Sequence, residues 1–272
     1  MNSIKVAVVC MHSELDALEN NLDKIEADVF KAADNHADIV CFPELSATGY
    51  TLKDPLRIYR RSNPHRIIER LAHIAVKSRC IVMAGMIELS DNDRPFITHV
   101  IAGPNGLIGQ YRKTHLSPVE KNIYLAGNNL SVYSWNNTPF GIQLCYEAHF
   151  PEISTVMALM GADIIFIPHA SPRGDPQGKL NSWLRHLRAR AFDNGVFIVA
   201  CNQVGENREG FLFPGVAVVL GPDGRIMTSY AGKNEKILFV ELKRETLDSV
   251  RQHRMKYFLP QRRPDLYRIA LR

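Results

Sequence analysis

Three short segments of this 272-residue sequence hold residues whose types could together carry out nucleophilic catalysis. A carboxylate, Glu44, directly follows one apolar run, a lysine, Lys113, follows a hairpin-like segment, and a cysteine, Cys145, ends a third apolar run. A thiolate can attack a carbonyl carbon after a general base such as a carboxylate has removed the thiol proton. A fixed ammonium group can then stabilise the oxyanion that forms. These residue types therefore predict hydrolysis through a covalent cysteine intermediate.

Cys145 is the cysteine, of five, whose surroundings favour a nucleophile. It lies between a short strand-like run and a predicted helix, where a helix N-terminus can lower the pKa of a thiol and free backbone N–H groups can bind an oxyanion. The other four lie in apolar, strand-like runs and are predicted to be buried thiols, as is typical of a protein of the reducing cytoplasm. They are Cys10, Cys41, Cys80 and Cys201.

Hydrophobic periodicity predicts the elements that position these residues. Apolar residues spaced by three or four predict a helix over residues 13–36 with Ser13 as its N-cap, and Asn63-Pro64 predicts the start of a second helix. Continuous apolar runs rich in β-branched residues predict strands that are covered on both faces. These runs are 39–42, 80–84, 164–167 and 196–200.

The sequence contains an internal repeat. The segments 100–108 and 218–226 both predict a β-hairpin around a Gly-Pro turn, and each half of the chain orders helix, strand, helix, strand and hairpin. We expect the halves to form an α/β fold, a four-layer α-β-β-α sandwich with a pseudo-twofold repeat, in a single domain over residues 1–272. Two separate α/β domains are the alternative, but no Pro/Gly/Ser-rich linker divides the halves.

The repeat also predicts part of a pocket wall. If the first-half strand ends at Glu44, its counterpart ends at His169, and the two strand ends should meet at one mouth of the sandwich. We therefore expect His169 and Ser171, together with Asn202 at the end of the next strand, to contact substrate, although His169 could equally be a structural histidine. Arg173, in the loop that follows, is a candidate partner for a substrate carboxylate.

Two further carboxylates, Glu147 and Glu152, flank Cys145 and are predicted to be structural. Arg188 or Arg190, on a predicted helix nearby, is expected to pair with one of them and to stabilise the turn that holds the nucleophile. Substitution of Glu147 should therefore act mainly through stability.

The three segments, which span residues 42–50, 111–116 and 141–152, resemble the nitrilase superfamily, the carbon–nitrogen hydrolases. The resemblance runs nearly from end to end of the chain. It implies an αββα sandwich and a catalytic Glu-Lys-Cys triad, which by motif match consists of Glu44, Lys113 and Cys145.

The same resemblance assigns a second glutamate, Glu120, to the catalytic set, where it would keep Lys113 charged and position substrate or water. The backbone N–H of Tyr146 is expected to stabilise the oxyanion together with Lys113, which makes Tyr146 a substrate-binding residue. The resemblance also implies that the chain pairs with a second copy.

The expected activity is metal-independent hydrolysis of a non-peptide carbon–nitrogen bond in an amide or N-carbamoyl compound, through a cysteine thioester and with release of ammonia. Nitrile hydrolysis by the same triad is less favoured, because family members with that activity generally carry a tryptophan after the cysteine and a longer C-terminal extension, whereas this chain has Tyr146 and ends at Arg272. A catalytically inactive scaffold is a further alternative, against which the intact Glu-Lys-Cys set argues. A Cys-His protease is disfavoured, since no histidine lies in a segment that plausibly partners Cys145.

Other classes of function lack their sequence signals. The chain has no His-Glu-x-x-His or Cys-x-x-Cys motif, no dinucleotide-binding glycine pattern and no P-loop, so neither a metal nor a cofactor is expected. No apolar run approaches the roughly 18 residues of a membrane-spanning helix, and the N-terminal apolar run is too short for a secretion signal. We therefore expect a cytoplasmic protein without a membrane partner.

The net charge of +5 is confined to the C-terminal tail, residues 241–272, which holds nine Lys and Arg against four Asp and Glu. A basic tail could bind nucleic acid. Apolar and aromatic residues run through the same stretch, however, which favours a tail that docks on the body or on a partner subunit. We expect a homodimer or an assembly of dimers with residues 255–259 at or beside the interface, and no nucleic acid partner.

Overall fold

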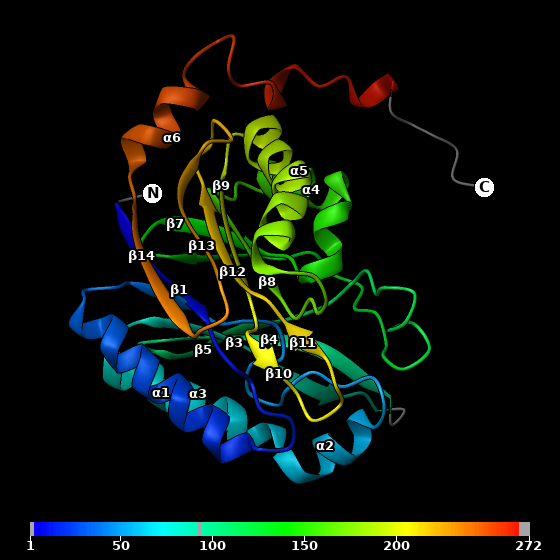
Figure 1. Cartoon of the computed structure of the whole chain (residues 1–272). Coiled ribbons are helices and arrows are strands. Elements are labelled where there is room, and N and C mark those ends of the chain that lie inside the picture. Colours follow the sequence, from blue (N-terminus) through cyan, green and yellow to red (C-terminus); the bar gives the residue numbers. More distant parts are fainter. Residues whose placement is uncertain (1–2, 92–93, 267–272) are drawn as a thin grey trace.

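The structure is a computed structural model that describes residues 3–91 and 94–266 (Figure 1). Its strands form two six-stranded sheets and one short hairpin. The first sheet contains β1 (Ile4–Cys10), β2 (Ile39–Cys41), β3 (Ile81–Leu89), β4 (Pro95–Gly103), β5 (Gly106–Arg112) and β14 (Lys236–Leu242). The second contains β6 (Val132–Trp135), β7 (Thr138–Ile142), β8 (Ile164–His169), β9 (Phe197–Asn202), β12 (Gly215–Leu220) and β13 (Ile226–Gly232). The hairpin is β10 (Gly205–Glu206) and β11 (Leu212–Phe213).

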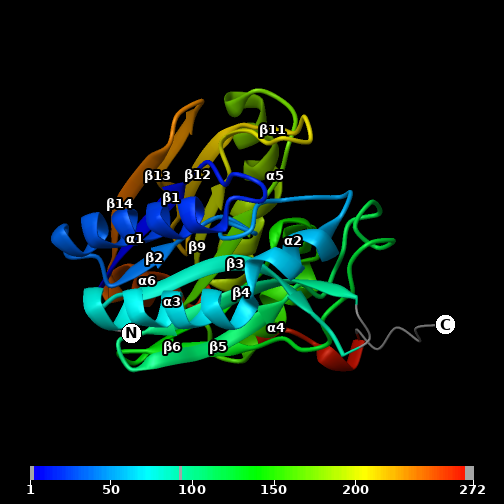
Figure 2. The same ribbon diagram turned by 90° about the horizontal axis from the view of Figure 1, so that it is seen from below.

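Helices lie on the outer faces of the two sheets (Figures 1 and 2). Those of the first half are α1 (Leu18–Asp34), α2 (Pro55–Ser62) and α3 (Pro64–Ser78). Those of the second half are η1 (Cys145–His149), a short 3₁₀ helix, then α4 (Pro151–Leu159) and α5 (Pro176–Asn194). After β14 come α6 (Arg244–Arg251) and two further 3₁₀ turns, η2 (Leu259–Gln261) and η3 (Pro264–Leu266). The arrangement confirms the predicted four-layer α-β-β-α sandwich.

The two sheets have the same strand order. In the first, β1, β2 and β3 are parallel and β4 and β5 follow as antiparallel neighbours. In the second, β7, β8 and β9 are parallel and β12 and β13 follow in the same way. Each sheet gains one antiparallel strand on its parallel side, β14 beside β1 and β6 beside β7. The internal repeat predicted from the sequence is therefore present in the topology.

The C-terminal strand β14 completes the first sheet, so the chain returns to its starting sheet after building the second (Figure 1). The stretch predicted as a tail from residue 241 therefore begins inside the body, with the end of β14 and with α6. Arg251 at the end of α6 bonds to the Asp163 carboxylate and donates to the carbonyl oxygen of Ala162. Residues 267–272 of the predicted tail lie outside the described residues.

The four apolar runs predicted as strands, 39–42, 80–84, 164–167 and 196–200, are buried throughout, as their continuous apolar composition predicted. Side chains alternate along each strand, so that Val6 and Val8 belong to the core between the sheets while Ala7 and Val9 pack toward the helices of the first half. No helix among the described residues is long and apolar enough to cross a membrane.

Two local details differ from the sequence-based expectations. The helix predicted over 13–36 begins later, at Leu18, and Ser13 is a buried residue rather than its N-cap. The helix α2 was not predicted from the sequence. Asp54 caps it by accepting a hydrogen bond from the backbone N–H of Arg57, and Pro55 is its first residue, which together form a helix-start signal. The predicted start of α3 is confirmed, since the side chain of Asn63 accepts from the backbone N–H of Arg66.

Gly85 on β3 supports the turn that follows β2. A Cβ atom placed on Gly85 would lie 2.2 Å from the backbone nitrogen of Leu45, so the turn rests directly on the glycine backbone. Ser46 fixes the contact further, because its hydroxyl accepts a hydrogen bond from the Gly85 N–H at 3.1 Å. Only glycine allows the approach, and the approach sets the position of Glu44 in the same turn.

We predict that Gly85→Ala lowers the stability by about 1–3 kcal/mol, as expected for overpacking against backbone that cannot move aside. Thermal unfolding measures the effect. The matched control is Gly221→Ala, where the one close contact of the added methyl would be with the end of the flexible Asp223 side chain, at 2.9 Å. Equal melting temperatures for the two variants would contradict the packing argument.

Candidate active site

Glu44 lies in the turn after β2 and its side chain has no exposed surface. One carboxylate oxygen, Oε2, accepts a hydrogen bond of 2.9 Å from the backbone N–H of Ala170, which follows β8 in the other half of the molecule. The carbonyl oxygen of Glu44 accepts a second bond, of 2.8 Å, from the side-chain amide of Gln203. The turns after β2 and after β8 thus meet at Glu44, as the internal repeat predicted.

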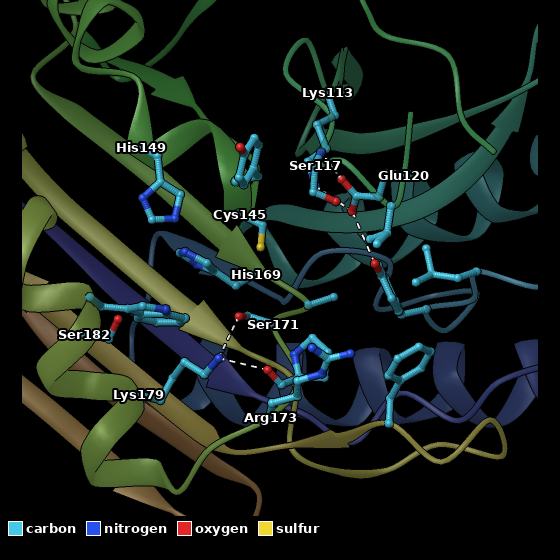
Figure 3. Close-up of a pocket in the computed structure, with 18 of the residues that line it drawn as sticks. Lys113, Ser117, Glu120, Cys145, His149, His169, Ser171, Arg173, Lys179 and Ser182 are labelled. Carbon is cyan, nitrogen blue, oxygen red and sulfur yellow. Dashed lines mark hydrogen bonds and ion pairs between the residues drawn. The ribbon is translucent and has the colours of Figure 1, made fainter. Parts of the chain in front are cut away.

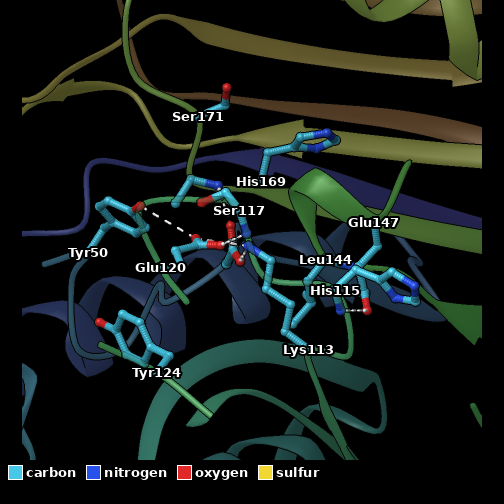
Figure 4. Close-up of polar contacts among 12 residues, drawn as sticks. Tyr50, Lys113, His115, Ser117, Glu120, Tyr124, Leu144, Glu147, His169 and Ser171 are labelled. Carbon is cyan, nitrogen blue, oxygen red and sulfur yellow. Dashed lines mark hydrogen bonds and ion pairs between the residues drawn. The ribbon is translucent and has the colours of Figure 1, made fainter. Parts of the chain in front are cut away.

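Lys113 follows β5 and extends its buried side chain between two carboxylates (Figure 4). Its Nζ lies 2.8 Å from Glu44 Oε1 and 2.9 Å from Glu120 Oε1. The other oxygen of Glu120 accepts a 2.8 Å bond from the backbone N–H of Ser117, and the Tyr50 hydroxyl donates to Glu120 at 3.4 Å. One ammonium group therefore joins two buried carboxylates.

The surroundings give the three groups different proton affinities. Burial raises the pKa of Glu44, and this effect outweighs the opposing charge of Lys113. Burial also favours a higher pKa for Glu120, but Lys113 and the Ser117 N–H outweigh it and hold the pKa of Glu120 below its ordinary value. Burial alone would lower the pKa of Lys113, yet the two carboxylates raise it well above its ordinary value. Lys113 and Glu120 stay charged, whereas Glu44 is the carboxylate best suited to exchange a proton.

Cys145 opens the 3₁₀ helix η1 in a left-handed backbone conformation, with φ of 47°. This conformation is unfavourable for a residue with a Cβ, and such strain is found at functional sites. Burial and the negative charge of Glu44 raise the pKa of the thiol, whereas the sequence had suggested that the helix N-terminus lowers it. The resting cysteine is therefore a neutral thiol, and it needs a base before it can act as a nucleophile.

Glu147 connects the turn that holds Cys145 with the segment that holds Lys113. Its carboxylate accepts hydrogen bonds from the Tyr111 hydroxyl, from the backbone and hydroxyl of Thr114, and from two further backbone N–H groups, those of His115 and Leu144. These partners do not include Arg188 or Arg190, one of which was expected to pair with either Glu147 or Glu152. Arg190 does stabilise the turn, but it donates to the carbonyl oxygens of Ala148 and His149.

Cys145 lines a cavity of about 440 Å³ (Figure 3). Lys113 and Glu120 line it as well, and so do four of the five residues predicted to contact substrate, Tyr146, His169, Ser171 and Arg173. The fifth, Asn202, is not part of the wall. Its side chain instead accepts from the Ser171 N–H at 2.8 Å and donates to the Ser171 carbonyl oxygen at 3.0 Å.

The family model described as carbon–nitrogen hydrolase matches residues 5–252 of this chain. The chain belongs to the carbon–nitrogen hydrolase family. This membership confirms the resemblance recognised in the three sequence segments.

Curated and solved relatives of this carbon–nitrogen hydrolase extend over nearly the whole chain. It is 28% identical to a nitrilase of Pyrococcus abyssi, with 97% of this chain and 99% of the relative covered. It is 28% identical to the omega-amidase NIT3 of Saccharomyces cerevisiae, covering 97% and 94%, and 26% identical to an N-carbamoylputrescine amidase of Solanum lycopersicum, covering 94% and 91%. An amidase of Nesterenkonia superimposes with a TM-score of 0.83 at 25% identity, covering 97% and 95%.

One helix face of this carbon–nitrogen hydrolase contributes cavity residues that the sequence reasoning missed. Lys179, Ser182, Trp183 and His186 lie on α5 with the spacing of one helical face, and all four line the cavity. Trp183 stacks on His169 with ring centroids 3.8 Å apart, and His169 Nδ1 lies 2.7 Å from the Ile167 carbonyl oxygen. The helical spacing was visible in the sequence, but nothing there showed that this face of α5 points at the cavity.

The part of the chain that the structure describes contains no group of three or more His, Cys, Asp or Glu residues that could hold a metal ion. Cys10, Cys41, Cys80 and Cys201 are buried free thiols, whereas Cys145 is partly accessible. Accessibility and location thus distinguish Cys145 from the other four cysteines.

We predict that Glu147→Gln lowers the stability by about 2 kcal/mol, because an amide has only one accepting oxygen and leaves several buried donors of the network unsatisfied. Thermal unfolding with a matched Glu152→Gln control measures the effect. Glu152 is exposed at the start of α4, so its substitution should change the melting temperature far less. Similar losses in both variants would show that the network around Glu147 contributes little.

Proposed function

We propose that this carbon–nitrogen hydrolase cleaves amide or N-carbamoyl compounds through a thioester on Cys145. The proposal rests on one observation: the buried Lys113 ammonium bonds to both Glu44 and Glu120, and Lys113 lines the same cavity as Cys145. Such a set supplies a nucleophile, a base and a fixed positive charge in one place. The names of the relatives, which include amidases and a nitrilase, support the same class of reaction.

In the first half of the proposed reaction, Glu44 takes the proton of the Cys145 thiol as the sulfur attacks the substrate carbonyl carbon. The carbonyl oxygen becomes an oxyanion, which the Lys113 ammonium and the backbone N–H of Tyr146 stabilise. Glu44 then returns its proton to the departing nitrogen. The carbon–nitrogen bond breaks, ammonia leaves, and the acyl or carbamoyl group stays on sulfur as a thioester.

In the second half, a water molecule enters the cavity and Glu44 takes one of its protons while the oxygen attacks the thioester carbon. Lys113 and the Tyr146 N–H stabilise the second oxyanion as they did the first. When the carbon–sulfur bond breaks, the acid product leaves and the proton on Glu44 returns to the Cys145 sulfur. From an amide this product is a carboxylic acid, and from an N-carbamoyl compound it is a carbamic acid, which loses CO2 to give the amine. Glu120 exchanges no proton in this scheme, because its permanent negative charge serves to hold Lys113 protonated and in position.

The substrate class is tested by ammonia release from a panel of amides, N-carbamoyl amino acids, N-carbamoyl amines and nitriles. We expect release from amides or N-carbamoyl compounds, and no change when a metal chelator is added. Release from nitriles alone would favour the nitrilase alternative, and the absence of turnover on every compound would favour an inactive scaffold.

We predict that Cys145→Ala and Cys145→Ser lower kcat by at least about 1,000-fold while the fold remains intact, since the nucleophile of a covalent mechanism has no substitute. Intact-protein mass spectrometry of the enzyme quenched during turnover should locate the acyl adduct on Cys145. Cys80→Ala, which changes a buried thiol on the far side of the first sheet, is the control. An adduct on another cysteine, or turnover retained in Cys145→Ala, would contradict the mechanism.

We predict that kcat/KM falls on the acid side with a midpoint above 4.5, the ordinary pKa of a glutamate side chain. Glu44 acts as a base only when ionised, and burial raises its pKa, so protonation removes the base at a higher pH than for an exposed glutamate. A pH–rate profile on a neutral amide measures the midpoint. A midpoint at or below the ordinary value would show that Glu44 is not the base.

We further propose that the chain forms a homodimer through the second-half helices and the C-terminal segment. Apolar side chains remain exposed on α4, on α5 and after α6, and Phe192 of α5 contacts Phe258 with ring centroids 5.5 Å apart. Exposed apolar side chains on neighbouring elements favour association with a second copy. The exposed apolar residues are Val156, Leu159, Met160, Phe192, Met255 and Phe258.

We also propose that the protein acts in the reducing cytoplasm, because four of its cysteines are buried free thiols.

Deletion of residues 254–272 should weaken dimer formation and lower the melting temperature, because it removes Phe258 and the buried Leu259 while it leaves Arg251 bonded to Asp163. Light scattering of the full-length and truncated proteins at matched concentration measures the association. A full-length protein that scatters as a 30.7 kDa monomer would refute the dimer. Salt-sensitive binding of nucleic acid by the full-length chain alone would instead support the basic-arm alternative.

A further inference from the structure

We infer that the cavity selects substrates that carry a carboxylate at the end remote from the scissile bond, and that Lys179 and Arg173 bind this carboxylate. The inference rests on the proposed amide or N-carbamoyl hydrolysis and names its substrate class. Its products would be ammonia and a dicarboxylic acid or, from N-carbamoyl compounds, ammonia, CO2 and an amino acid.

Outside the catalytic residues, the charged side chains that line the cavity are all positive. Apart from Lys113 and Glu120, which bond to each other, the charged side chains of the wall are Arg173 and Lys179. No carboxylate of the described residues lies within ion-pair distance of either of these two cations. The cavity therefore offers uncompensated positive charge to whatever enters it, which attracts an anion and repels an ammonium group.

Lys179 is placed where the fold alone does not favour a cation. It is the fourth residue of α5, in the first helical turn, where the helix dipole disfavours positive charge. Burial lowers the pKa of its ammonium, which a thiolate on Cys145 would raise again, so Lys179 and the nucleophile act on each other across the cavity. Figure 3 shows the Lys179 side chain extending from α5 toward the cavity.

Two neighbours direct the Lys179 ammonium without neutralising it. Its Nζ donates 2.9 Å hydrogen bonds to the hydroxyl of Ser171 and to the carbonyl oxygen of Pro172 (Figure 3). An ammonium has three donors, so one remains for a ligand. Because both acceptors are uncharged, the full positive charge stays available for a charge-assisted bond to a carboxylate.

The loop that carries Arg173 is fixed from two sides. Asn202 bonds to both the N–H and the carbonyl oxygen of Ser171, and the backbone N–H of Arg173 donates to the Leu212 carbonyl oxygen at 2.9 Å. Arg173 also has a φ of 73°, a left-handed conformation that is unfavourable for any residue with a Cβ. The surrounding bonds hold this strained conformation, which is characteristic of a residue placed for binding.

The test compares kcat/KM for three series of primary amides of matched chain length. One series ends in a carboxylate, namely the monoamides of the dicarboxylic acids from malonic to adipic acid, one ends in a methyl group and one in an ammonium group. We expect kcat/KM for the best carboxylate compound to exceed that of its neutral counterpart by at least about tenfold, which is the effect of one charge-assisted hydrogen bond. The ammonium compounds should have the lowest kcat/KM. The preference should shrink as salt is added.

Lys179→Gln separates charge from loop positioning, because glutamine can still donate to Ser171 and Pro172. We expect it to lower the ratio of carboxylate to neutral kcat/KM by about tenfold, mainly through KM, and Lys179→Arg to restore most of the ratio. Lys31→Gln makes the same change on the exposed face of α1 and should leave the ratio unchanged. A wild-type enzyme without charge preference, or a Lys179→Gln variant whose ratio stays the same, would overturn the inference.

A binding measurement distinguishes failure of the proposed hydrolysis from failure of the carboxylate site. Thermal shifts of the wild-type protein with succinate, glutarate and adipate, against the diols and diamines of the same lengths, report anion binding without turnover. Stabilisation by a dicarboxylate that is lost in Lys179→Gln would support the anion site even if no amide is hydrolysed. Equal shifts with all three classes of compound would contradict it.

Discussion

The bonding of one buried ammonium to two buried carboxylates is the constraint on which the rest of the site depends. Three buried charges are tolerated only when each is well hydrogen bonded. Lys113 supplies a donor to Glu44 and to Glu120, the Ala170 N–H satisfies the second oxygen of Glu44, and the Ser117 N–H satisfies that of Glu120. These bonds tie the turn after β2, the segment after β5 and the turn after β8 to one point. Both halves of the sandwich must therefore be in place before the group can form.

The same bonding gives Glu44 and Glu120, two chemically identical side chains, pKa values that are shifted in opposite directions. Glu120 has several partners that favour its charged form, whereas for Glu44 burial prevails and makes the carboxylate a better proton acceptor. Burial also keeps the Cys145 sulfur protonated until a substrate arrives, so the nucleophile is formed where it is used. In the proposed mechanism this difference gives the two glutamates separate roles: Glu44 exchanges protons, and Glu120 keeps the Lys113 ammonium charged.

Much of this fold and of its candidate site could be predicted from the sequence. The parallel strands are visible as continuous apolar runs, the matching Gly-Pro hairpins reveal the repeat, and the repeat places His169 opposite Glu44. What failed depends on contacts between distant segments. An arginine was expected to pair with Glu147 or Glu152, but the oxygens of Glu147 accept from Tyr111 and backbone groups that only the tertiary fold brings near. Asn202 was expected in the wall but lies behind Ser171, and the cavity face of α5 became visible only when the helix was placed against the sheet.

The most direct test of the coupled carboxylates is the pH–rate profile of Glu120→Gln on a neutral amide. In the folded protein the negative charge of Glu120 raises the pKa of Glu44. Its removal frees Lys113 to favour the ionised form of Glu44, so we expect a large loss of kcat together with an acid limb that moves to lower pH than in the wild type. An acid limb that stays in place or moves to higher pH, or a variant with normal kinetics, would contradict the claim that one buried lysine couples the two glutamates.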